Sequence, residues 1–144
     1  EGLCLKLYDR RAGVFVSLKK GGSLRGCIGT IEAVQPFVAA EIIQNAVSAC
    51  SKDPRFSPVE ADELEQLTIS VDVLGETEKI YDLEELDVKR YGVIVTRGFR
   101  RGLLLPNLDG VDTVEEQIAI AKQKAGIGAN EDVELERFEV VRHF

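Results

Sequence analysis

Alternation of apolar and polar side chains predicts β-strands along most of this chain. The pattern is clear from Gly13 to Lys20 and from Leu67 to Leu74, where every second residue is apolar. A period of two sends successive side chains to opposite faces of a sheet, so both segments fit half-buried strands. Further strands are predicted at 24–30, 92–97, 100–106 and 133–141. Tight turns at Gly21-Gly22 and Gly98-Phe99 join four of these segments into two hairpins.

Helical spacing of apolar residues predicts a helix after each hairpin. The first covers 36–52, begins at Pro36 and ends near Asp53, because a residue before proline leaves the α region. We expect it to bury one stripe and to turn another toward solvent. The buried stripe is Ala39, Ile42, Ile43, Ala46 and Cys50, and the opposite side is Glu41, Asn45, Ser48 and Lys52.

The second helix, over 113–125, has clear end signals. Thr113 and Glu116 fit a capping box, and Gly126 is placed to end the helix. Its predicted buried residues are Val114, Ile118, Ala121 and Ala125. Acidic stretches between the strands predict a short helical turn within 57–66 and a short helix over 82–86.

The order hairpin, helix, strand therefore occurs twice. Residues 13–74 and 92–141 each have a β-β-α-β order, in which Arg25 corresponds to Arg101. The second copy has no thiol at the position of Cys27. The fold class that this predicts is α+β, with two β-β-α-β units, mainly antiparallel sheets and flanking helices.

The strand Leu24-Arg25-Gly26-Cys27-Ile28-Gly29-Thr30 has an unusual set of side chains. Alternation puts Arg25 and Cys27 on the same face, and glycine within a strand marks a place where a backbone or ligand comes close. An arginine beside a cysteine favours the thiolate, so Cys27 and Arg25 are candidate catalytic residues. The structural alternative is that Cys27 behaves as a small buried apolar residue.

A cysteine nucleophile needs a general base, and the single histidine, His143, lies one residue from the C-terminus. We expect the 36–52 helix to cover the Cys27 sulfur, with Arg25 reaching the edge of a cleft. Arg25 either pairs with a carboxylate, for which Glu32, Glu41 and Asp72 are candidates, or holds an anionic ligand.

Other residues are candidates for the same anionic ligand. They are Gly26, Gly29 and Thr30 of the strand, Arg55 in the following loop, and Arg101. The tip of the second hairpin has Phe99 among three arginines, Arg97, Arg100 and Arg101. This tip is either a solvated edge or a binding site for a phosphate or a single-stranded nucleic acid.

Composition narrows the function classes. The 144 residues carry 18 basic and 25 acidic side chains, and a net charge of −7 argues against general nucleic-acid binding. Most of the acidic stretch 60–87 fits a solvated surface, the alternative being contact with a basic partner.

No apolar run is long enough for a membrane span. The three cysteines have no paired spacing and there is one histidine, so the sequence predicts no disulfide framework, metal site or cofactor. The cysteines fit a reducing cytoplasm.

The motifs L-R-G-C-I-G-T (24–30), D-P-R-F (53–56) and R-R-G-L-L-L-P (100–106) resemble the AMMECR-type domain family. The resemblance covers most of the chain and implies a single domain over 1–144. It implies a larger lobe that holds the termini, a smaller lobe, and a cleft near the first motif. Members of this family usually begin with a helix ahead of the first strand, which we expect to be missing here.

The resemblance associates bacterial and archaeal members with Memo-like and radical-SAM partners, and so implies an undefined modification pathway. Three functions stay open. The chain is an enzyme or enzyme subunit that uses Arg25 and Cys27, a non-catalytic protein-interaction module, or a nucleic-acid-binding domain that uses the tip at 97–101.

Overall fold

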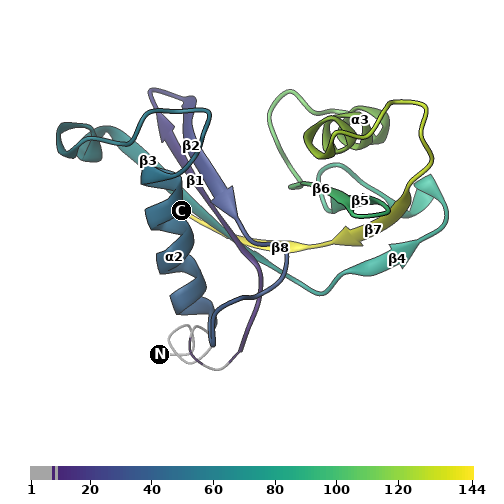
Figure 1. The fold of residues 1–144 in the computed structure, drawn as a ribbon, viewed down its shortest axis with the longest axis horizontal. Coiled ribbons are helices and arrows are strands. Elements are labelled where there is room, and N and C mark those ends of the chain that lie inside the picture. The colour runs from purple at the N-terminus through teal and green to yellow at the C-terminus, as the bar shows by residue number, and fades with distance from the viewer. Residues whose placement is uncertain (1–7, 9) are drawn as a thin grey trace. The chain divides into compact units, whose positions relative to one another are not determined.

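The computed structural model describes Tyr8 and residues 10–144, which form two compact units (Figure 1). One unit runs to Leu74 and is completed by Val141–Phe144, and the other is Gly75–Val140. The expectation about a helix ahead of the first strand lies outside the described residues. Within the described residues, no helix is both long and apolar enough to cross a membrane.

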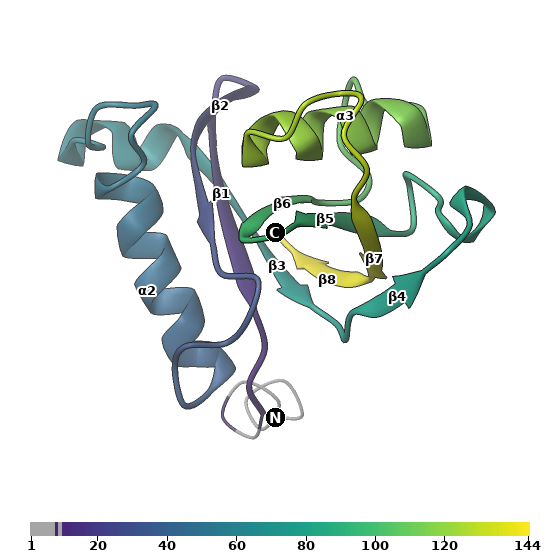
Figure 2. The ribbon, with the colours of Figure 1, turned by 45° about the vertical axis from the view of Figure 1, so that its right-hand side comes forward.

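The first unit contains a four-stranded sheet in the order β2-β1-β3-β8. Its elements are β1 (Val14–Lys20), β2 (Ser23–Gly29), α2 (Val38–Ser51), β3 (Leu67–Leu74) and β8 (Val140–His143). β1 pairs antiparallel with β2 and with β3. Figure 2 shows α2 along one face of this sheet, and the core forms there from alternate β1 residues with Val38, Ala49 and Val73. A short 3₁₀ helix, η1 (Ala61–Gln66), precedes β3.

The predicted orientation of the first helix is wrong in part. Glu41 and Asn45 are 0% and 2% exposed, whereas Ile43 is 65% exposed. The polar pair is buried because each side chain finds partners there: Glu41 accepts bonds described below, and Asn45 donates from Nδ2 to the Val14 carbonyl at 3.0 Å. A hydrogen-bonded polar group is tolerated inside a core. Ile42 and Cys50 do pack against the core, as the apolar stripe predicted.

The second unit contains a four-stranded sheet in the order β4-β7-β5-β6. Its elements are β4 (Glu78–Ile80), η2 (Leu83–Glu85), β5 (Gly92–Arg97), β6 (Arg100–Leu104), α3 (Val114–Ala125) and β7 (Glu134–Phe138). The predicted ends of α3 are confirmed: Thr113 Oγ1 accepts the Glu116 N–H at 3.1 Å, and Gly126 ends the helix with φ 71°. α3 packs on β5 and β6 through a core that includes Ala121 (Figure 2).

The single strand predicted over 133–141 is two strands. β7 ends at Phe138 and β8 begins at Val140, and the two strands belong to different sheets. The change occurs at Glu139, whose carbonyl accepts the Gly75 N–H at 2.8 Å. Phe138, Glu139 and Val140 still alternate, so the residues at the break gave no local sign of it, although the apolar positions change phase between Leu135 and Phe138.

The β-β-α-β order is confirmed in both units. In each, the first strand of the hairpin pairs with the second strand and with the strand that follows the helix. A glycine of the second strand also lies against the helix backbone: a Cβ on Gly26 would be 2.5 Å from the Ala49 carbonyl oxygen, and one on Gly102 would be 2.2 Å from that of Ala121. Both contacts leave no room for a methyl group.

The equivalence extends to a buried amide on each helix. The amide residue lies four positions before the helix residue that contacts the glycine. Asn45 donates to the Val14 carbonyl, and Gln117 donates to the Tyr91 carbonyl at 2.9 Å. The two units therefore attach helix to sheet by the same pair of contacts.

These contacts predict that Gly26→Ala and Gly102→Ala each lower the free energy of unfolding. Overpacking a tight contact typically costs about 1–3 kcal/mol, which exceeds the gain of about 0.4–1 kcal/mol from a stiffer unfolded chain. Urea denaturation would measure the change, with Ser23→Ala on the exposed end of β2 as the control. Unchanged stability in both glycine variants would show that the helices do not press on the strands in solution.

Candidate functional site

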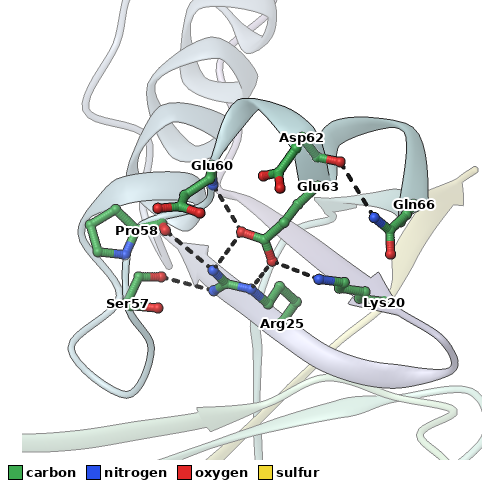
Figure 3. A network of polar contacts seen from close by, with 8 residues as sticks. All are labelled: Lys20, Arg25, Ser57, Pro58, Glu60, Asp62, Glu63 and Gln66. Atoms are coloured by element: carbon green, nitrogen blue, oxygen red, sulfur yellow. Dashed lines mark hydrogen bonds and ion pairs between the residues drawn. The ribbon is translucent and has the colours of Figure 1, made fainter.

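Arg25 lies at the centre of a polar network on the outer side of β2 (Figure 3). Its guanidinium binds Glu63 through two bonds, from Nε to Oε1 at 3.0 Å and from Nη2 to Oε2 at 3.1 Å. It also donates from Nη1 to the Ser57 carbonyl at 2.9 Å and from Nη2 to the Pro58 carbonyl at 3.3 Å. Lys20 adds a third cationic contact, from Nζ to Glu63 Oε1 at 3.0 Å. All three guanidinium nitrogens therefore already have partners.

Glu63 is held in place by the short helix η1. Its Oε2 accepts the Glu60 N–H at 2.9 Å, as part of a capping box. The hydrogen bonds from Arg25, from the Glu60 N–H and from Lys20 lower the pKa of Glu63 to about 2. The same pair raises the pKa of Arg25, chiefly through the hydrogen bond to Glu63.

The expected carboxylate partners of Arg25 are therefore corrected to Glu63. Glu41 instead accepts bonds from Thr30 Oγ1 at 2.8 Å and from the backbone of Val34 and Gln35. Asp72 binds Arg142 in β8 through two bonds of 2.7 and 2.8 Å. Glu63 lies in the acidic stretch that the sequence assigned to solvated surface, and the E-x-x-E spacing of Glu60 and Glu63 was the signal that could have identified it.

A shallow depression of about 700 Å³ lies over this network. Its lining residues are Lys20, Arg25, Phe56, Ser57, Pro58, Val59, Glu60, Asp62 and Glu63. The Arg25 charge inside it is neutralised by Glu63, so an anionic ligand of Arg25 would have to displace that carboxylate. Within residues 10–144, no three histidine, cysteine or acidic side chains gather in an arrangement that could hold a metal ion.

The D-P-R-F segment lies on the same outer edge of β2. Asp53 Oδ2 accepts the Cys27 N–H at 3.0 Å, and Arg55 Nη2 donates to the Cys27 carbonyl at 3.3 Å. The two side chains also bind each other, at 3.0 Å from Nε and 2.8 Å from Nη2. Hydrogen bonding by Arg55 first, and by the Cys27 and Arg55 backbone N–H groups next, holds the pKa of Asp53 well below its usual range.

Cys27 is half-buried, on the face of the sheet away from α2. This corrects the expectation that the helix covers its sulfur: Gly26 contacts the helix, so the alternating residue Cys27 points the other way. Its Sγ lies 3.3 Å from Ser17 Oγ on the paired strand. His143 is in β8, at the opposite edge of the sheet, so three strand spacings of about 4.8 Å separate the two strands. That distance of about 14 Å rules out a Cys–His pair.

The other motif residues make contacts within the fold. Gly26 makes room for the α2 backbone, and Gly29 lies under the Phe15 ring, where a Cβ would be 2.2 Å from Cγ. Thr30 bonds to Glu41 and accepts the Asn45 Nδ2–H at 3.2 Å. Each of these three residues therefore has a role within the fold.

The arginines of the second hairpin are paired with carboxylates. Glu131 lies 3.3 Å from Arg97 and 3.1 Å from Arg100, whose hydrogen bond lowers its pKa, and Arg101 lies 3.4 Å from Glu136. Phe99 at the tip is 97% exposed. The structure thus brings Arg25, Cys27 and Arg55 together along β2, whereas Arg101 belongs to the second unit.

The lowered pKa of Glu63 predicts a pH dependence of stability. A carboxyl group whose pKa falls from about 4.3 in the unfolded chain binds fewer protons when folded, so stability rises with pH. Its contribution is complete above about pH 4.3 and is lost as the pH falls toward the folded-state pKa of about 2. Glu63→Gln should flatten the pH dependence of the free energy of unfolding in this window, measured by urea denaturation. An unaltered slope would mean that the carboxylate is unpaired in solution.

Comparison with known proteins agrees with this architecture. The AMMECR1 family model matches residues 3–143. A Thermotoga maritima protein is 56% identical over 99% of this chain and 83% of its own length, and a Clostridium acetobutylicum protein is 57% identical over 96% of this chain. This chain spans only 29% of the Clostridium protein. The crystal structure of an uncharacterized Pyrococcus horikoshii protein superposes with a TM-score of 0.86 at 32% identity, covering 95% of this chain and 74% of that one. The chain belongs to the AMMECR1 family.

Proposed function

We propose that this chain is a non-catalytic binding module, and that it acts in a modification pathway with Memo-like and radical-SAM partners. The proposal rests on the charged side chains of the motifs, which are all bound within the fold. Arg25 is bound to Glu63 and Arg55 to Asp53, and both arginines also hold backbone carbonyls. The motif residues build the first unit, which leaves other surfaces to meet partners.

An enzyme that uses Cys27 is the alternative, and two features argue against it. A cysteine nucleophile is activated by a base or by a nearby cation. The histidine is on the far edge of the sheet. The two nearby guanidinium groups are each bound to a carboxylate, that of Arg25 to Glu63 and that of Arg55 to Asp53. Binding of a small anionic ligand to Arg25 is disfavoured for the same reason, because Glu63 already accepts both hydrogen bonds from the Nε and Nη2 groups of its guanidinium.

Nucleic-acid binding through the second hairpin is disfavoured by charge. Arg97 and Arg100 share the Glu131 carboxylate, which reduces the positive potential of the tip. The unit that carries this tip, Gly75–Val140, has 15 acidic and nine basic residues. Binding to phosphates depends on cations that can replace counterions, and here they are engaged internally.

A protein partner fits the exposed aromatic side chains of the second unit. Phe99 and Tyr81 are 97% and 85% exposed, and each lies on a fixed support. Phe99 occupies a turn between two arginines that Glu131 anchors, and the Tyr81 N–H is bound by the Glu85 carboxylate at 3.0 Å. Exposed aromatic side chains are frequent hot spots, and a backbone that is already held in place has less freedom to lose on binding.

Binding should survive loss of the thiol and weaken when an aromatic contact is removed. The purified chain would be titrated calorimetrically with the Memo-like and radical-SAM proteins of one bacterium that encodes all three. Cys27→Ala should bind as the wild type does, whereas Phe99→Ala or Tyr81→Ala should weaken binding about thirtyfold, the effect of losing about 2 kcal/mol at a hot spot. Ile69→Ala, half exposed on β3, is the matched control.

Two results would contradict the proposal. The first is an absence of binding to either protein. The second is a folded Cys27→Ala variant that no longer binds, which would return the thiol to the functional site.

A further inference from the structure

The outer edge of β2 is closed by two side chains rather than by a strand. β2 is the outermost strand of its sheet, and an unpaired edge exposes backbone groups that can pair with another chain. At Cys27 both outward groups are satisfied, the N–H by Asp53 Oδ2 at 3.0 Å and the carbonyl by Arg55 Nη2 at 3.3 Å. An antiparallel neighbour would supply the same acceptor and donor from one of its own residues.

We propose that Asp53 and Arg55 take the place of a neighbouring strand, and that they keep the β2 edge from pairing with an extended strand of a second copy of this chain. The pair is well suited to this role because it is fixed from several sides. Asp53 is 4% exposed and also accepts the Arg55 N–H at 3.1 Å, and the Arg55 guanidinium lies 5.4 Å from the Phe56 ring centre.

Arg25 extends the closure along the same edge. Its bonds to the Ser57 and Pro58 carbonyls hold the loop after Arg55 beside β2, and Glu63 fixes the guanidinium that makes them (Figure 3). The segment 53–58 therefore covers the edge through side-chain bonds, with no strand ladder of its own. Removing the two central bonds exposes the N–H and the carbonyl of Cys27 together.

The released groups determine the register of a β2–β2 pair. A two-fold axis at Cys27 lets the two copies exchange both bonds at that residue, with the two Cα atoms about 5.5 Å apart. This register places Arg25 opposite Gly29 of the second copy. An axis at Arg25 is disfavoured because a β-bulge interrupts the regular register of β2 at that residue.

The closure is tested first by amide hydrogen exchange. Asp53→Ala should speed exchange of the Cys27 amide about tenfold relative to that of Ile28, whose N–H points toward β1, because only the Cys27 amide loses its acceptor. Arg142→Gln, which removes a similar Asp–Arg pair at the other edge of the sheet, is the matched control. An unchanged ratio in Asp53→Ala would overturn the proposal.

The second test is the oligomeric state. A variant that combines Asp53→Ala with Arg55→Ala should double its mass in light scattering at concentrations where the wild type does not. In a Cys4→Ser, Cys50→Ser background, a short bis-maleimide should link its two Cys27 residues. A folded double variant whose mass matches the wild type, or a dimer that the reagent does not link, would refute the pairing. If the double variant fails to fold, a variant that combines Asp53→Ser with Arg55→Gln, which also removes both bonds to the Cys27 backbone, is measured in its place with the same outcomes.

Discussion

The close approach of helix backbone to a strand glycine controls the arrangement of each unit. At Gly26 and at Gly102 the helix carbonyl lies where a Cβ would be, so the helix must sit on that face of the hairpin. Because strand side chains alternate, Cys27 then faces away from α2. Arg25 does not share that face as the alternation predicted, because a β-bulge pairs Leu18 with Gly26 but Lys19 with Leu24 and leaves Arg25 out of the register. Its side chain instead reaches Glu63 and the loop that follows α2. The position of the thiol follows from a packing contact one residue away.

The two motifs of the first unit act together as one structural element. The loop after α2 returns to β2, where Asp53 and Arg55 bind the Cys27 backbone and Arg25 binds the carbonyls that follow. Glu63 completes the set by neutralising Arg25 and Lys20. Sequence features that suggested reactive chemistry are thus explained by long-range hydrogen bonding within the fold, which supports a binding module over an enzyme.

Local signals in the sequence predicted local structure well. Glycine turns marked both hairpins, and Thr113 and Gly126 marked the ends of α3, because each signal acts within a few residues. The burial of Glu41 and the pairing of Arg25 with Glu63 depend on residues 11 and 38 positions away. Periodicity treats a charged residue as solvent-facing and carries no information about distant partners, so it placed Glu41 on the wrong side and left Glu63 on the surface.

The charge of Arg25 is used inside the fold, and a double-mutant cycle between Arg25 and Glu63 tests this most directly. Arg25→Ala, Glu63→Ala and the double variant would be compared with the wild type by urea denaturation at neutral pH. We expect a favourable coupling free energy well above experimental error, because each single variant removes the two bonds between the guanidinium and the carboxylate, even though Lys20 still contacts Glu63 when Arg25 is replaced. Additive effects with no coupling would contradict it, and would return Arg25 to the role of a free anion-binding residue.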